Sequence, residues 1–274
     1  MAGPDYTAIE LLARLVAFDT TSHKSNFAII AFIEDYLLQH GVRSHRVVDE
    51  SGEKACLYAT IGPEHTAGVA LSGHTDVVPV DGQAWSSDPF TLRQENGKIY
   101  GRGACDMKGY LACMLASVPD FKARKLKVPI HLAFSYDEEV GCLGVRPMIA
   151  EFGKTLQKPR LVIVGEPTSM QVVDAHKGPV RWQVEVSGRA AHSSMAHLGV
   201  NAITYAARLI SEIERMEAEL KITSRNERFD PPYATLQVTK LEGGTANNII
   251  PVYCRFGFEV RALAGVDVDG IERR

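Results

Sequence analysis

Three short apolar runs constrain the fold of this chain most strongly. They cover residues 69–72, 128–136 and 160–164, and patterns with helical spacing lie between them. Strands that alternate with helices are typical of a mostly parallel sheet with helices packed on its faces. The sequence therefore predicts an α/β fold built around such a sheet.

Polar side chains of one kind follow each of these predicted strands. They are His74 and Asp76 after the first strand, Glu138 and Glu139 after the second, and Glu166 after the third, while Asp106 stands just before another helical pattern. Ligands of open α/β sheets bind outside the carboxyl ends of the strands. We therefore expect these side chains to converge at one edge of the sheet.

An imidazole and several carboxylates in one cleft indicate a metal site. Their negative charge is unfavourable there unless cations neutralise it. Zn²⁺ accepts such ligands, and an acid shared by two ions gives a binuclear site. In the pair His74-x-Asp76, one ring nitrogen can bind the ion while the other donates to the carboxylate. The alternative is that these residues are ordinary polar groups on separate loops.

Two further local features bear on this edge. If one of the adjacent Glu138 and Glu139 is a ligand and the other a base, the backbone must turn there, because neighbouring residues of a strand point opposite ways. Gly141 makes such a turn plausible, and Asp137 is interpreted as structural. The polar link at residues 19–26 could line a pocket, but a solvated turn with a helix cap is the interpretation favoured.

The pattern changes after residues 176–179 (HKGP), where we expect a hinge. An alternating strand at 180–187, a long amphipathic helix at 201–220 and strands at 234–241 and 252–262 follow. This order predicts the start of an α+β sandwich. We therefore divide the chain into domains at residues 1–177 and 178–274.

Composition excludes several classes of protein. The net charge of −3 over 274 residues does not indicate the excess of basic residues that is typical of nucleic-acid-binding proteins. No apolar stretch approaches the ~20 residues of a membrane span. The N-terminal sequence lacks the basic and apolar regions of a signal peptide. The five scattered cysteines, with no C-x-x-C pair, favour reduced thiols in a cytoplasmic protein.

Six ordered motifs carry a resemblance to a known family. They are SGHTDVVPV, YGRGACDMKG, YDEEVGCLG, VGEPT, GRAAHSSMAHLGVNAI and GGTANNIIP. Together they resemble the zinc metallopeptidase and aminoacylase family, which includes acetylornithine deacetylases, succinyl-diaminopimelate desuccinylases and glutamate carboxypeptidases. HKGPVRW and FDPPYATLQV are most similar to the acetylornithine deacetylase branch, and the desuccinylase branch is the nearest alternative.

The resemblance implies metal-dependent hydrolysis of the amide bond of a small N-acyl amino acid. It implies two zinc ions, with cobalt as a possible substitute. It places His74 and Glu166 on one metal and Glu139 on the other, with Asp106 as the bridge. Asp76 would orient His74. Glu138 would be the general base that takes a proton from the attacking water and passes it to the departing amine.

The resemblance also implies a catalytic domain at 1–177 and a lid and dimerisation domain at 178–274. In a homodimer, His192 would reach across the interface to stabilise the tetrahedral oxyanion. Asn248 and Arg261 would contact the substrate, and the planar guanidinium of Arg261 suits a carboxylate.

The sequence departs from the family at its end. In the family, the chain returns to the catalytic domain and supplies a last histidine ligand. Here no histidine follows His197, and the sequence ends at Arg274. We therefore expect part of the second domain and the closing segment of the first to be missing. Two interpretations follow from this: a deacylase, and a non-catalytic relative or fragment that binds metal.

Overall fold

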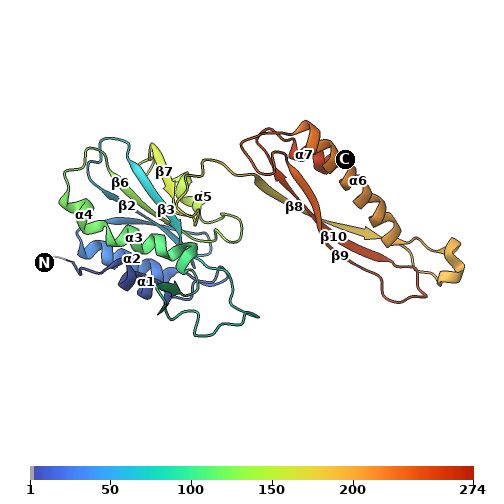
Figure 1. The fold of residues 1–274 in the computed structure, drawn as a ribbon, viewed down its shortest axis with the longest axis horizontal. Helices are drawn as coiled ribbons and strands as arrows, with labels where there is room; N and C mark the ends of the chain where they lie inside the picture. The colour runs from blue at the N-terminus through green and yellow to red at the C-terminus, as the bar shows by residue number, and fades with distance from the viewer. Residues whose placement is uncertain (1–2) are drawn as a thin grey trace. The chain divides into compact units, whose positions relative to one another are not determined.

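The computed structural model describes residues 3–274, which form two compact units, the first ending at Gln171 and the second covering Val172–Arg274 (Figure 1). Within the described residues, no helix is both long and apolar enough to cross a membrane. The division falls a few residues before the predicted hinge. The catalytic and lid roles of the two units remain predictions.

The first unit is built on a five-stranded sheet. In spatial order its strands are β1 (Ser44–Val48), β2 (Ala55–Ile61), β6 (Ile130–Ser135), β3 (Val69–His74) and β7 (Leu161–Val164). β3 is parallel to both β6 and β7, whereas β2 is antiparallel to β1 and β6. All strands except β2 therefore point the same way, which confirms the mostly parallel sheet.

Helices cover both faces of this sheet. They are α1 (Ala8–Val16), α2 (Phe27–Gln39), α3 (Gly109–Ala116), α4 (Val118–Ala123) and α5 (Val145–Ala150). The four helices α1, α2, α3 and α4 pack in one core against the sheet face that carries Leu57 and Phe134. Figure 1 shows α1, α2 and α3 gathered on that side. A second, smaller core on the opposite face contains Tyr58 and Met148 of α5.

Local sequence signals explain several element boundaries. A capping box begins α1, because Thr7 accepts a hydrogen bond from the Glu10 amide while the Glu10 carboxylate accepts one from Thr7. The helical pattern that follows Asp106 forms two helices, α3 and α4, which are separated at Ser117, and Pro119 lies in the first turn of α4. Proline is tolerated there because its missing N–H would have no partner inside the helix.

Sequence reasoning missed β1 and the hairpin of β4 (Arg93–Glu95) and β5 (Lys98–Tyr100). Its turn residues Asn96 and Gly97 have φ values of 50° and 73°. An Asn-Gly pair between short strands is the sequence signal for such a turn, so this hairpin could have been found.

The expectation of a solvated turn at residues 19–26 holds only for His23, Lys24 and Ser25, which are exposed. Thr20, Thr21, Ser22 and Asn26 are buried. The hydroxyl of Thr20 donates to the carbonyl of Thr75 (2.5 Å), and the backbone near Thr21 pairs with that of Val77. The link therefore packs against the chain that follows β3, where its polar groups are paired.

The second unit confirms the predicted α+β arrangement. Its antiparallel sheet has the order β8 (Gly178–Ser187), β10 (Tyr253–Ala262) and β9 (Thr235–Gly243). The helices α6 (Ala202–Thr223) and α7 (Val268–Arg273) contribute to the same core as the inward residues of β8 and β10. Trp182 stacks on Phe258 within this core, with ring centroids 4.9 Å apart, and is a packing residue.

Phe134 tests the core that holds the first unit together. It is fully buried between the sheet and the helices. We expect Phe134→Ala to lower the free energy of unfolding of the first unit by about 3–5 kcal/mol, because burial is lost and a cavity remains. Leu38→Ala is the control, since Leu38 is 60% exposed and its removal should have little effect. Denaturant unfolding followed by circular dichroism measures both, and equal effects would contradict this packing.

Candidate metal centre

His74 lies at the end of β3 with its ring almost fully buried and its orientation fixed. Its Nδ1 atom lies 2.9 Å from the main-chain carbonyl of Asp76 and 3.4 Å from the Asp76 carboxylate. Both partners are acceptors, so the proton belongs on Nδ1. Nε2 therefore faces the acids on the other side of the ring.

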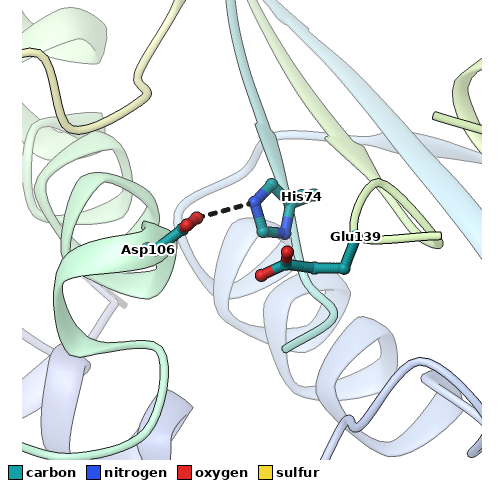
Figure 2. Close-up of side chains that lie close together, drawn as sticks. All are labelled: His74, Asp106 and Glu139. Atoms are coloured by element: carbon teal, nitrogen blue, oxygen red, sulfur yellow. Dashed lines mark hydrogen bonds and ion pairs between the residues drawn. The ribbon is translucent and has the colours of Figure 1, made fainter. Parts of the chain in front are cut away.

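Three carboxylates lie near Nε2 on the other side of the ring. Nε2 lies 3.0 Å from Asp106, 3.7 Å from Glu166 and 3.9 Å from Glu138. Figure 2 shows Asp106 and Glu139 approaching His74 from opposite sides. Asp106 belongs to the helical segment Ala104–Lys108, and Glu139 lies in the loop after β6. The convergence expected from the sequence is therefore present within the first unit.

These donors form two overlapping groups that could each hold an ion. One contains His74, Asp106 and Glu139, and the other contains His74, Glu138 and Glu166. In each group the candidate ligand atoms lie within 4.8 Å of one another. An imidazole with carboxylates is a donor set that Zn²⁺ and similar divalent ions accept. The residues present therefore fit a metal site, although geometry alone does not distinguish Glu138 from Glu139 as the ligand.

Glycines allow the surrounding elements to approach. A Cβ atom on Gly73 would lie 2.6 Å from Leu111 and 2.8 Å from Met107, whose sulfur accepts the His74 amide. A Cβ atom on Gly165 would lie 2.0 Å from the ring of Tyr110. Larger residues at these two positions would displace His74 and the segment that carries Glu166.

Asp76 holds the loop of the two glutamates as well as the imidazole. Its Oδ1 atom accepts the Glu138 amide (3.1 Å), and its Oδ2 atom accepts the Glu139 amide (3.3 Å). The hydroxyl of Ser22 also donates to Oδ2, at 2.8 Å. Sequence reasoning missed Ser22. The polar run at residues 19–26, for which a pocket lining was the alternative to a solvated turn, was the signal that could have found it.

The chain does turn at the glutamate pair. Asp137 begins the turn with a φ of 51°, and Gly141 lies within it at 116°. The carbonyl of Glu138 accepts the amides of Gly141 and Cys142, both at 2.9 Å. The predicted turn at Gly141 is therefore present, and it starts earlier, at Asp137.

The cluster shifts the pKa values of its own members. Burial, and then the charge of Asp106, raises the pKa of Glu139 to about 7. Burial also raises the pKa of Glu166. Burial alone would lower the pKa of His74, but the hydrogen bond and charge of Asp76 and the other acids raise it to about 9. A site that raises the pKa values of its acids and of its imidazole is one that a cation stabilises.

The second unit holds the other predicted site residues. Asn248 lies beside His192, because its carbonyl accepts the Ser193 amide (2.9 Å) and the strand-like bridge His192–Ile249 follows. Arg261 pairs with Glu259 at 2.8 Å, near the far end of β10. Asn248 precedes the start of β10 at Tyr253, and the rise per residue of a strand puts Arg261 about 27 Å further along β10. Within this unit, Arg261 is therefore not brought together with His192 and Asn248.

Comparisons with known proteins decide the family. The model of peptidase family M20/M25/M40 matches residues 70–244. The chain belongs to this family. The match includes all of the candidate metal ligands and His192, so the cluster lies in the part of the chain that the family shares.

Curated and solved relatives agree with this assignment. The chain is 34% identical to the acetylornithine deacetylase of Proteus mirabilis strain HI4320 over 97% of its own length and 70% of that protein's. It is 38% identical to that of Myxococcus xanthus, over 93% and 66%. An M20 metallo-carboxypeptidase from Sulfolobus solfataricus has the same fold, with a TM-score of 0.76, 21% identity and coverage of 97% and 73%. The chain is a member of a family of metal-dependent hydrolases.

The raised pKa values predict how stability depends on pH in the absence of metal. Glu139 has a higher pKa in the folded chain, so the folded state loses stability as pH rises from about 4.5 to about 7. Protonated His74 contributes stability below about 6.5, which is lost as pH rises through about 9. Hydrogen bonds from His74 and Ser22 lower the pKa of Asp76 despite its burial. The stability that its charged form contributes is therefore already complete at any pH above the ordinary pKa range of an aspartate.

We therefore expect the melting temperature of the metal-free chain to fall between about pH 5 and about pH 8. Glu139→Gln should raise the melting temperature at the higher pH and change it little at the lower, because the glutamine carries no charge to bury. Added zinc should raise the wild-type value at the higher pH by binding the folded state. A melting temperature that increases over this range in the metal-free chain would contradict the assignment.

Proposed function

We propose that this protein is a metal-dependent amidohydrolase that converts N-acetylornithine to ornithine and acetate in arginine biosynthesis. The observation that carries the proposal is the cluster of His74 and four carboxylates in a chain 34–38% identical to acetylornithine deacetylases. Removal of a succinyl group from diaminopimelate is the alternative within the same family. The five free cysteines fit the reducing cytoplasm in which such an enzyme would act.

The proposed metals are two zinc ions that would share Asp106, with cobalt as a substitute. Asp106 lies 3.0 Å from Nε2 of His74, which belongs to both groups of candidate donors. Of the predicted ligands, only Asp106 and Glu139 would hold the second ion, so its ligand set is incomplete. Zinc chemistry at this position would supply polarisation of the amide carbonyl and a water molecule acidic enough to lose a proton near neutral pH. The remaining steps belong to side chains of the protein.

Glu138 is the proposed general base. Its backbone amide is held by Asp76, and its carboxylate lies at the same face of the His74 ring as Asp106 and Glu166. From there it would take a proton from the attacking water and return it to the departing amine. A base must lie within hydrogen-bond reach of the proton it moves, and the anchored loop provides that position.

His192 is the proposed oxyanion donor. Its Nδ1 atom accepts the backbone amide of Ser194 at 3.2 Å, which puts the ring proton on Nε2. An Nε2–H group can donate to the oxygen of a tetrahedral intermediate. Asn248, whose backbone is adjacent, and Arg261 would bind the substrate, and the guanidinium would pair with its carboxylate. A homodimer would let His192 act on the partner's metal centre.

Metal content separates the roles of the two glutamates. We expect Glu138→Ala to reduce kcat by several orders of magnitude with metal content nearly unchanged, because only the proton-transfer group is lost. Glu139→Ala should lower metal content, because a ligand is lost. Atomic absorption and N-acetylornithine hydrolysis measure the two effects. Loss of stoichiometric metal in Glu138→Ala, with normal metal in Glu139→Ala, would reverse the assignment.

Complementation tests whether His192 acts in trans. Each of His192→Ala and Glu138→Ala should be inactive alone, but mixed subunits should recover activity, because a heterodimer contains one intact composite site. A mixture of Glu138→Ala with Glu139→Ala is the control and should stay inactive, since both changes lie in the same unit. If subunit exchange is verified and the first mixture also stays inactive, the trans role is wrong.

A further inference from the structure

A closed ring of contacts lies behind the two glutamates. The Ser22 hydroxyl donates to Asp76, and the Ser22 carbonyl accepts a hydrogen bond from the Lys54 ammonium group. Lys54 also pairs with the Asp137 carboxylate at 2.5 Å. The next residue, Glu138, returns the ring to Asp76 through its backbone amide. Segments far apart in the sequence are thereby tied to one carboxylate.

The ion pair in this ring is unusually well shielded. The side chains of Lys54 and Asp137 are each only 15% exposed. In every other Lys or Arg ion pair among residues 3–274, at least one side chain is more than a third exposed. Removing one member of a shielded pair leaves the other charge without compensation, so such a pair couples the segments that carry it.

The backbone at Asp137 needs such a restraint. Its φ of 51° is uncommon for a residue other than glycine, and surrounding contacts must hold it. Two are present: the pair with Lys54, and the hydrogen bond from the Leu143 amide to the Asp137 carbonyl at 3.0 Å. The direction in which Glu138 and Glu139 leave the strand depends on this turn.

We propose that Lys54 is a positioning residue that, through Asp137 and Ser22, holds the amides of Glu138 and Glu139 on Asp76 and so places both carboxylates against His74. The effect of Lys54 on catalysis rests on the proposed function, whereas the restraint that Lys54 places on the glutamate loop does not. Asp137, interpreted from the sequence as structural, is the link through which Lys54 acts.

Hydrogen exchange tests the restraint directly in the metal-free chain. We expect Lys54→Met to increase exchange of the Glu138 and Glu139 amides by about tenfold or more, the factor that corresponds to losing one hydrogen bond to a charged group. Core amides such as that of Phe134 should keep their protection, which a general loss of stability would not allow. Asp137→Asn should produce the same local effect, and the double variant should add little to either.

Two further variants complete the design. Lys154→Met removes a lysine from an exposed surface pair of the same unit and should leave exchange unchanged. Lys54→Arg keeps the charge and should restore most of the protection. If Lys54→Met does not fold, Asp137→Asn decides the question by the same measurement. Exchange of both amides within twofold of wild type in a folded variant would overturn the proposal.

Zinc binding and turnover connect the restraint to the site. Lys54→Met should weaken zinc binding, measured by calorimetry, and lower kcat more than it raises KM, because the acids are misplaced while substrate contacts remain. If local exchange increases but the wild-type enzyme hydrolyses no N-acyl amino acid, the proposed function fails and the restraint stands. If the enzyme is active and Lys54→Met leaves exchange, zinc binding and kcat unchanged, the restraint fails alone.

Discussion

Mutual repulsion among four carboxylates around one buried imidazole is the constraint on which the first unit depends. Asp106, Glu138 and Glu166 all lie within 4.0 Å of the same ring nitrogen, and the pKa of Glu139 is raised by burial and by Asp106. Such an arrangement is unfavourable without cations, so the surrounding structure must hold it in place. The architecture of the unit can be understood as the means of doing so.

Three kinds of support meet at this point. The parallel strands β3, β6 and β7 end together and bring their following residues to one edge. Gly73 and Gly165 allow helix side chains to pack closely behind the ligands. Asp76 then accepts hydrogen bonds from the imidazole side, from the glutamate loop and from Ser22, so that one carboxylate fixes three segments. Metal sites require such outer contacts, because ligand orientation depends on them.

The second unit serves a different physical purpose. Its sheet and helices share a single apolar core, and its polar site residues lie on the surface of that scaffold. Nδ1 of His192 contacts the Ser194 amide at 3.2 Å and the Ser194 hydroxyl at 2.8 Å, and these contacts orient the ring. If His192 is the proposed oxyanion donor, this orientation reduces the entropy lost when it binds a developing charge.

The α/β class and the set of acids at the sheet edge could be predicted from the sequence. Local patterns carry that information, since strand periodicity and the residues after each strand are visible along the chain. Tertiary structure decided the rest. The polar run at residues 19–26 looks solvated because pairing partners such as Thr75 and Asp76 are about 50 residues away. Likewise, Asp137 has no local sign of importance, and only the fold brings it to Lys54, because a shielded ion pair between distant segments has no periodicity to reveal it.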